Sequence, residues 1–315
     1  MNEFIESIIT TQKPYLKQTS ISQYVKSIDR LAKALKLPDE PVDSFDFIKD
    51  SEKVELFLSK FSFTTRRNYY SAIITLLQSE TTPDKDLIKS YSKIVRDTND
   101  QYTKQNESGI VSEKQQEKLV SYEKIMELLA SLKREKSKME YILFKLLSIY
   151  HLRNEVATLQ KISPTEYKKL TKEETDGNNY LVMGTKKITI YRNDYKTNKK
   201  YGTIKIDITD KDFMKELRDY TDTLTDNIVF PYNEEMMTKK RLTNHLMYHS
   251  RKHIGIGLST TMLAKSILSH KYAEGQSQQK EDAAARGHSV GIQNNIYVKR
   301  LPEEEADKEF LDDSE

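Results

Sequence analysis

A polar stretch about one third of the way along the chain divides the sequence into two parts with different periodicity. Residues 98–118 contain almost no large apolar side chains and are rich in Asn, Gln, Lys and Glu. A segment this polar has little to bury, so we expect an interdomain linker over residues 101–118. The chain has 315 residues, which is enough for two domains of ordinary size, over 1–100 and 119–300.

The first part is predicted to be all helical. Apolar residues recur at helical spacing over 20–37, 51–60, 64–79 and 87–95. In the first of these segments the apolar positions are Ile21, Tyr24, Val25, Ile28, Leu31 and Leu35, and Pro38 closes it. Four amphipathic helices of this kind predict a compact helical unit.

The second part mixes helices with a few strands. Helical spacing is found over 121–132, 139–152, 211–224, 237–253, 260–270, 278–286 and around 290–297. Residues 178–184, 187–191 and 203–208 are short and β-rich, and the last two are joined by the polar segment 194–200, which predicts a hairpin. The expected fold is mainly α with a small antiparallel β-sheet.

Composition excludes several kinds of chemistry. The chain has no cysteine, which excludes disulfides, thiolate zinc sites and a cysteine nucleophile. No apolar run approaches the roughly 20 residues that span a bilayer, and the N-terminus lacks a signal-peptide pattern. We therefore expect a soluble, intracellular protein with no membrane partner.

Charge is distributed unevenly. The formal net charge is +3, but residues 301–315 carry eight acids and one lysine, so residues 1–300 hold 50 basic against 40 acidic groups. A basic body suits a polyanion such as DNA, because binding to phosphates releases counterions. A lysine-rich solvated surface is the alternative interpretation.

Three segments of the second part contain candidate catalytic residues, and these follow a particular order along the chain. Arg153 follows an apolar helix in the run 150–155, Lys196 lies in the polar hairpin, and Gly287-His288-Ser289 precedes Tyr297, which is nine residues after His288. This order resembles the catalytic domain of the tyrosine recombinase (integrase) family. The resemblance covers about residues 120–300, and the helical first part resembles that family's core-binding domain.

The resemblance implies a role for each of these residues. Tyr297 would attack a phosphodiester and form a 3′-phosphotyrosine, and Arg153 would stabilise the charge that develops on the phosphate oxygens. His288 would assist the tyrosine hydroxyl, whose pKa is ordinarily near 10. Lys196 would protonate the leaving 5′ oxygen, with Lys199 and Lys200 as rivals. No metal or nucleotide cofactor is implied.

One family motif departs from the pattern. The family's histidine-x-x-arginine maps to Thr261 and Ala264. A threonine hydroxyl still donates a hydrogen bond to phosphate, whereas alanine cannot replace a guanidinium. Three explanations are open: an engineered substitution that traps a DNA complex, which we favour, a naturally inactive protein, or Lys265 acting as the cation one position away.

Further residues are predicted to contact double-stranded DNA; they are Lys17, Lys26, Arg66, Arg67, Lys199, Thr261 and Lys265.

The family resemblance implies a tetramer on two DNA sites, with the acidic tail 301–315 exchanged between protomers; a disordered acidic end is the alternative. Frequent Lys, Asn and Ile suggest an A·T-rich viral or mobile-element genome. A type IB DNA topoisomerase and a non-catalytic DNA-binding protein of the same fold are alternative functions.

One group of histidines lies outside this pattern. His245, His249 and His253 recur every four residues on one predicted helix, which is a metal-ligand spacing. The sequence shows no accompanying carboxylate, so we expect these histidines on a DNA-facing or solvated basic surface.

Overall fold

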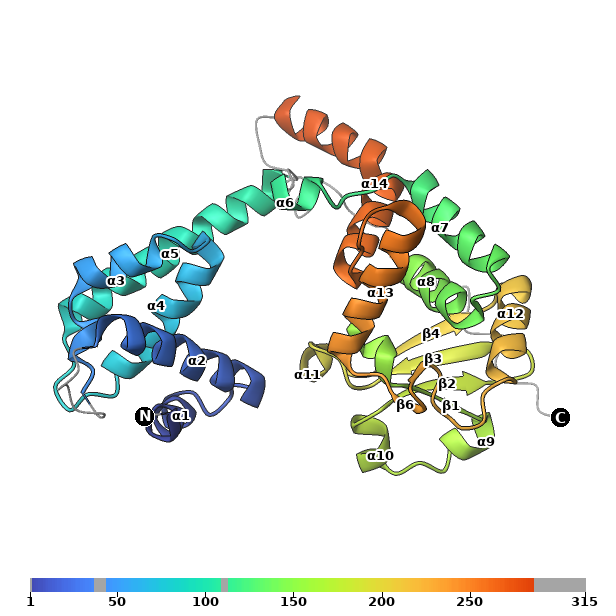
Figure 1. Ribbon diagram of the computed structural model, residues 1–315, viewed down its shortest axis with the longest axis horizontal. Coiled ribbons are helices and arrows are strands. Elements are labelled where there is room, and N and C mark those ends of the chain that lie inside the picture. The colour runs from blue at the N-terminus through green and yellow to red at the C-terminus, as the bar shows by residue number, and fades with distance from the viewer. Residues whose placement is uncertain (1, 37–43, 109–112, 286–315) are drawn as a thin grey trace. The chain divides into compact units, whose positions relative to one another are not determined.

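The computed structural model describes residues 2–36, 44–108 and 113–285, and the chain forms two compact units, Met1–Val111 and Ser112–Glu315. Each unit has its own hydrophobic core. We call them the N-terminal unit and the C-terminal unit. The predicted fold class, mainly helical with one small sheet in the second part, is confirmed (Figure 1).

The N-terminal unit is entirely helical within the described residues. Its elements are α1 (Asn2–Gln12), α2 (Gln18–Leu35), the 3-10 helix η1 (Asp46–Ile48), α3 (Ser51–Leu58), α4 (Phe63–Leu77) and α5 (Lys85–Ser108). Helix α2 buries Ile21, Val25, Ile28 and Leu31, spaced at three and four residues as its amphipathic pattern predicts. The hydroxyl of Tyr91 donates a hydrogen bond of 3.0 Å to the carbonyl oxygen of Ile48, which fixes η1 against α5.

Helix α5 is longer than the sequence pattern predicts. A helix was expected only over 87–95, yet α5 runs from Lys85 to Ser108, well into the predicted linker 101–118. Its second half is polar, and apart from the buried Thr98 the side chains described there are exposed, so it shows no hydrophobic periodicity. The extension is supported by Arg67, whose Nη1 donates to Oδ1 of Asn99 at 3.1 Å, and by ring contact between Phe63 and Tyr102.

The C-terminal unit combines helices with two sheets. Its helices are α6 (Glu113–Gln116), α7 (Tyr122–Arg134), α8 (Lys138–Tyr150), η2 (Asn154–Thr158), α9 (Pro164–Tyr167), α10 (Lys172–Asp176), α11 (Asn198–Tyr201), α12 (Lys211–Thr221), α13 (Lys239–Ile254) and α14 (Thr260–Ala285). Its strands are β1 (Leu159–Ile162), β2 (Asn179–Met183), β3 (Ile188–Arg192), β4 (Ile204–Ile208), β5 (Pro231–Tyr232) and β6 (Glu235–Met236).

The larger sheet is mixed. Its order is β1-β2-β3-β4, and the three predicted strands β2, β3 and β4 pair antiparallel as expected, whereas β1 pairs parallel to β2. The parallel pairing arises because the chain crosses over through α9 and α10 before it returns as β2. Strand β1 has only four residues, two of them polar, and was therefore missed.

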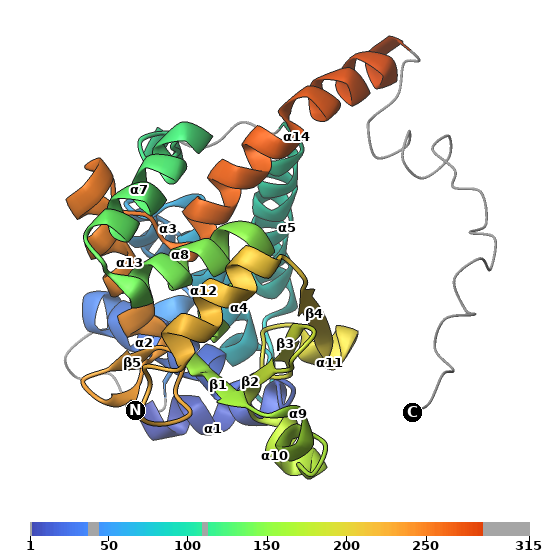
Figure 2. The same cartoon turned by 90° about the vertical axis from the view of Figure 1, so that its right-hand side faces the viewer.

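The two faces of this sheet are covered differently. Leu181 and Ile190 are register partners on the face that belongs to the main hydrophobic core. On the opposite face Tyr180 and Tyr191 are also partners, and the ring of Tyr167 in α9 packs on both. Helix α8 lies on one side of the sheet, and α9 and α10 lie on the other (Figures 1 and 2). Strand β2 is thus covered on both faces.

Helix α14 is a single long helix. Two helices were predicted, over 260–270 and 278–286, but the structure shows one from Thr260 to Ala285, with Gly275 inside it. Its first turns bury Met262, Leu263 and Ile267 in the core, and its second half extends away from the other helices of the unit (Figure 2). Within the described part of the chain, no helix combines the length and apolar character needed to cross a membrane.

Candidate functional site

The end of helix α8 exposes Arg153. His151 adopts a left-handed conformation (φ 50°, ψ 36°), and its backbone N–H closes the helix on the carbonyl oxygen of Leu147. A left-handed residue at this position ends a helix, and it is uncommon for a residue other than glycine. Leu152 is then buried in the core, and Arg153 is exposed. Among the described residues, no carboxylate forms an ion pair with Arg153, so its guanidinium is free to bind an anion.

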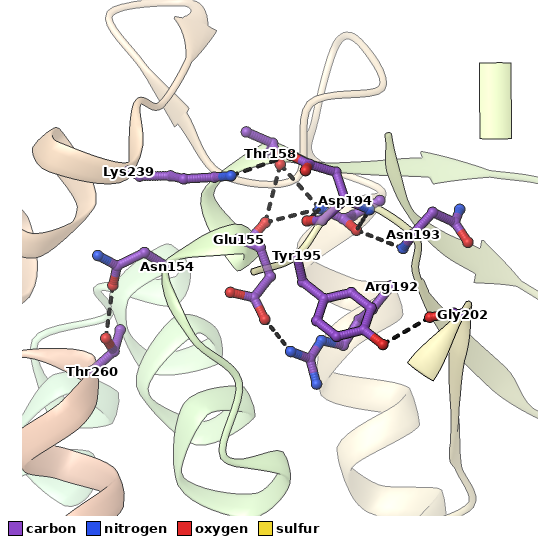
Figure 3. A network of polar contacts seen from close by, with 11 residues as sticks. Asn154, Glu155, Thr158, Arg192, Asn193, Asp194, Tyr195, Gly202, Lys239 and Thr260 are labelled. Carbon is purple, nitrogen blue, oxygen red and sulfur yellow. Dashed lines mark hydrogen bonds and ion pairs between the residues drawn. The ribbon is translucent and has the colours of Figure 1, made fainter. Parts of the chain in front are cut away.

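Asn154 fixes this loop to two other elements. Its Nδ2 donates to the hydroxyl of Thr243 in α13 at 3.0 Å, and its Oδ1 accepts from the hydroxyl of Thr260, the first residue of α14, at 2.7 Å. Figure 3 shows the second of these contacts. The loop that carries Arg153 is therefore tied to the beginning of α14, where the second family motif was predicted.

The hairpin that carries Lys196 is tied to the same region. Asn179, at the start of β2, accepts hydrogen bonds from the backbone N–H groups of Asn193 and Asp194 at 2.9 and 3.0 Å. Its Nδ2 donates to the carbonyl oxygen of Asp194 and to the hydroxyl of Thr158 in η2. One buried side chain thus holds the beginning of the hairpin against the short helix that follows Arg153.

Lys196 follows a buried anchor. Tyr195 is 5% exposed, and its hydroxyl donates to the carbonyl oxygen of Gly202 at 2.7 Å across the hairpin (Figure 3). Gly202 has φ +64°, a left-handed conformation that glycine adopts without strain. The anchored Tyr195 leaves the next residue, Lys196, exposed, and Lys199 and Lys200 in α11 are exposed as well.

Two ion pairs connect the hairpin to its surroundings (Figure 3). The carboxylate of Glu155 accepts from the guanidinium of Arg192 in β3, and both side chains are largely buried. Lys239, at the start of α13, pairs with Asp194 at 3.1 Å, and this second pair is exposed. Glu155, two residues after Arg153, therefore pairs with Arg192 of strand β3.

The first turns of α14 carry the residues aligned with the second family motif. Thr261 is exposed, and Ala264 is half-buried one turn after Thr260. Lys265 is also half-buried, and its Nζ donates to Oε1 of Gln115 in α6 at 2.8 Å. Lys265 would have to leave this partner before it could act as a phosphate-binding cation.

The other predicted residues lie elsewhere or outside the described residues. His288, Tyr297 and the acidic tail 301–315 belong to the part of the chain that the structure does not describe. In the N-terminal unit, Lys17 and Lys26 are exposed, whereas Arg66 and Arg67 are half-buried on α4. Of the predicted catalytic residues, Arg153 and Ala264 lie on segments that the hydrogen bonds of Asn154 join, and Lys196 lies in a hairpin that the hydrogen bonds of Asn179 hold.

The prediction for the three histidines of α13 is wrong. The side chains of His245, His249 and His253 are only 13%, 17% and 2% exposed, so they do not form a solvated surface. The sequence offered no carboxylate partner, but the structure places Glu140 from α8 beside His245 and His249. This carboxylate lies 105 positions from His245, so no local pattern reveals it.

Sequence reasoning also missed the two asparagines that organise the site. Asn154 was noted only as a neighbour of Arg153, and Asn179 only as part of a predicted strand. Asparagine is uncommon in strands, because its side chain competes for backbone hydrogen bonds. An asparagine that opens a buried strand was therefore an available sign that its side chain has a partner.

Comparison with known proteins returned only distant structural similarity. Neither a protein-family model nor a curated protein matches the sequence. The chain is similar to solved structures of one class of protein, the site-specific recombinases.

Three of the solved structures that the chain resembles are described here. XerA recombinase has a TM-score of 0.36 at 12% identity, and the match covers 94% of each chain. XerH recombinase bound to difH in a pre-cleavage complex has a TM-score of 0.45 at 10% identity, with 93% of this chain and 90% of that chain covered. The XerH post-cleavage complex with palindromic difH has a TM-score of 0.45 at 12% identity, with 92% and 87% covered. These values are too low to assign a function.

Proposed function

We propose that this protein is a site-specific DNA recombinase that cuts and rejoins double-stranded DNA through a phosphotyrosine at Tyr297. The observation that carries the proposal is the hydrogen-bond network around Asn154. It joins the loop of Arg153, which is exposed and has no ion-pair partner among the described residues, to the first turn of α14; the motif order had singled out these two segments separately.

The chemistry of this region suits a phosphodiester. An exposed guanidinium binds two phosphate oxygens at once, and its bidentate hydrogen bonds are stronger than neutral ones. The first backbone N–H groups of α14 carry a partial positive charge, and Asn154 accepts a hydrogen bond from the Thr260 hydroxyl at this end of the helix. Because Asn154 holds both elements in place, little reorganisation is needed when negative charge develops in the transition state.

We propose that catalysis by this sequence is impaired, because position 264 is alanine where the family motif has arginine. A helical side chain leans toward the N-terminus of its helix, so an arginine at position 264 would extend over Thr260 and Thr261 toward the Arg153 loop. Loss of one preorganised transition-state donor typically reduces the rate by about 10²–10³-fold. Lys265 is bonded to Gln115 and does not supply the missing charge in this arrangement.

We propose further that the partner is double-stranded DNA, that four protomers assemble on two DNA sites, and that the protein acts inside a cell. Lys196 is proposed as the general acid and His288 as the group that assists Tyr297. Lys17, Lys26, Arg66, Arg67, Lys199 and Thr261 are proposed as phosphate contacts. No metal ion or nucleotide is required for this transfer, because the phosphotyrosine conserves the energy of the phosphodiester.

The proposal is tested by restoring the missing arginine. Ala264→Arg, incubated with a DNA library of candidate sites, is expected to form a covalent protein–DNA adduct on denaturing electrophoresis. The rate should exceed that of the starting sequence by about 10²–10³-fold. Ala264→Met gives a long side chain without the guanidinium and should not gain activity. Tyr297→Phe in the Ala264→Arg background should abolish the adduct.

Other outcomes distinguish the alternative functions. Tight DNA binding without any adduct in Ala264→Arg would favour a non-catalytic DNA-binding protein. An adduct accompanied by relaxation of supercoiled plasmid, without joining of two sites, would favour a type IB topoisomerase.

A further inference from the structure

Three side chains from two helices converge at a second site in the C-terminal unit. Nε2 of His245 lies 3.1 Å from Oε1 of Glu140, and Nε2 of His249 lies 3.7 Å from the same oxygen. Each residue offers one ligand atom, and these atoms all lie within 4.8 Å of one another. The histidines are one turn apart on α13, and Glu140 is in the first turn of α8.

These separations match the edges of a metal coordination tetrahedron. Zn²⁺ binds histidine nitrogen and carboxylate oxygen at about 2.0–2.2 Å, so neighbouring ligand atoms lie roughly 3.3–3.6 Å apart. The two distances to Glu140, 3.1 and 3.7 Å, lie on either side of this range. Two of the three separations are thus close to this range, and the third, between the two histidines, is within 4.8 Å.

No hydrogen bond among the described residues explains why the ring of His249 lies beside Glu140. The 3.7 Å between its Nε2 and Glu140 is too long for a hydrogen bond, and its Nδ1 is buried with no hydrogen-bond partner among the described residues. A polar ring in this position ordinarily has a partner, because an unmade hydrogen bond is costly when buried. An ion bound at Nε2 would give the ring a partner on that nitrogen, whereas Nδ1 would still have none among the described residues.

The protonation states also suit a cation. Burial, and then the charge of His245, lowers the pKa of His249, so its ring is neutral at pH 7 and can donate a lone pair. Burial opposes ionisation of Glu140, but the hydrogen bond from His245 and the charges of both histidines outweigh it and lower the pKa of that carboxyl. A neutral ring at His249 and an ionised carboxylate at Glu140 both suit a cation.

His253 has a different role. Its Nδ1 is 2.9 Å from the hydroxyl of Ser131 in α7, and its side chain is almost fully buried. It therefore packs α13 against α7, and the candidate ligands are limited to the other two histidines and Glu140.

We infer that Glu140, His245 and His249 bind one divalent transition-metal ion, with Zn²⁺ as the expected occupant and a fourth position open to solvent. Two histidines and one glutamate form a common three-ligand set for zinc. The ion would clamp α13 to α8. Because Thr243 on the same helix holds Asn154, metal binding would also stabilise the loop that carries Arg153.

The test uses the full chain after treatment with EDTA, with ZnSO₄ or CoCl₂ as the added metal. We expect one tightly bound Zn²⁺ per chain and, at about 100 times Kd, a rise in the melting temperature of the C-terminal unit of about 5–10 °C. Bound Co²⁺ should show the visible absorption of a low-coordinate nitrogen and oxygen site.

Matched variants separate this site from other histidines. His249→Gln is expected to weaken Zn²⁺ binding by more than about 100-fold, since even the outer partners of metal ligands contribute about 10–100-fold. His270→Gln changes an exposed histidine that stacks on Tyr122, and it should bind Zn²⁺ like the unchanged protein.

Two results would overturn the inference. One is the absence of Zn²⁺ and Co²⁺ binding to the unchanged protein, and the other is binding that His249→Gln leaves intact. If circular dichroism shows that His249→Gln is unfolded, Glu140→Gln takes its place, and an unaltered Co²⁺ spectrum in that variant also overturns the inference. None of these measurements depends on DNA cleavage, so they stand apart from the proposed function.

Discussion

The two units of this protein bury different kinds of side chain. In the described part of the N-terminal unit the buried polar residues are Thr75 and Thr98, and each bonds to a carbonyl of its own helix, four residues back. The described part of the C-terminal unit buries eight polar or charged residues: Glu155, Asn179, Thr189, Asn193, Thr221, Ser250, Thr260 and Ser266. Two of these connect segments more than 100 positions apart: Thr260 bonds to Asn154, and Ser266 bonds to the backbone N–H of Val120.

This difference in buried polar residues shows which interactions determine the structure of each unit. Apolar burial is favourable but not directional, so it makes the helices of the N-terminal unit compact without fixing any one loop precisely. Hydrogen bonds depend on distance and angle, and a buried donor left without an acceptor is costly. The C-terminal unit therefore fixes the loop of Arg153 and the hairpin of Lys196 by contacts that tolerate little displacement.

The largest expected effect comes from breaking the buried ion pair. Glu155→Ala leaves the guanidinium of Arg192 largely buried without its carboxylate, which should destabilise the C-terminal unit by about 3–5 kcal/mol. Scanning calorimetry should show one unfolding transition at a lower temperature and a second one unchanged. Lys239→Ala is the control, because it removes an exposed ion pair that is worth about 0–1 kcal/mol. An equal loss in both variants would contradict the distinction between buried and exposed pairs.

The N-terminal unit should respond to loss of apolar volume. Ile73 is fully buried in α4, and Ile73→Ala is expected to cost about 2–5 kcal/mol through lost burial and a residual cavity. Calorimetry should show a shift of the transition that Glu155→Ala leaves unchanged. Ile73→Val, which removes one methyl group, should cost only about 0.5–1.5 kcal/mol. If both transitions move together, the two units do not unfold independently, and the comparison fails.

The accuracy of the helix and strand predictions also differed along the chain. Helical periodicity indicated α2, α3 and α4 because their apolar residues face one core. It failed in the second half of α5, where the residues are polar and the described side chains after Thr98 are exposed. It also failed for β1, a strand of four residues whose parallel partner comes 20 positions later.

The sequence predicted individual residues of the candidate site but not their surroundings. The order of Arg153, Lys196 and Ala264 indicated one region, but nothing local in the sequence identifies the side chains that hold the segments carrying these residues. Asn154 contacts Thr243, 89 positions away, and Glu140 contacts His245, 105 positions away. Contacts at such separations follow from the fold and cannot be read from spacing.

The smallest expected effect concerns a polar cluster at the edge of the C-terminal core. The carboxylate of Glu216 accepts from Lys133 at 2.8 Å, from Lys145 at 2.5 Å and from the hydroxyl of Tyr141. Burial opposes its ionisation, but these partners outweigh burial and lower the pKa of Glu216 below its ordinary 4.5. A lowered folded-state pKa adds stability above the unfolded-state pKa, and this stability is lost as the pH falls through the folded value.

Glu216→Gln should therefore cost about 1 kcal/mol at neutral pH, where the carboxylate is charged and bonded. The same variant should make the C-terminal transition less sensitive to acid below about pH 4.5, the ordinary pKa of the group it removes. Calorimetric scans from pH 7 to about pH 3 measure both effects over the range in which glutamate titrates.

Glu127→Gln, an exposed position on α7, gives the baseline for loss of one surface carboxylate. If Glu216→Gln and Glu127→Gln lose stability in parallel as the pH falls, the lysines do not stabilise the charged form of Glu216. The polar edge of the C-terminal unit would then resemble the solvated surface of the N-terminal unit.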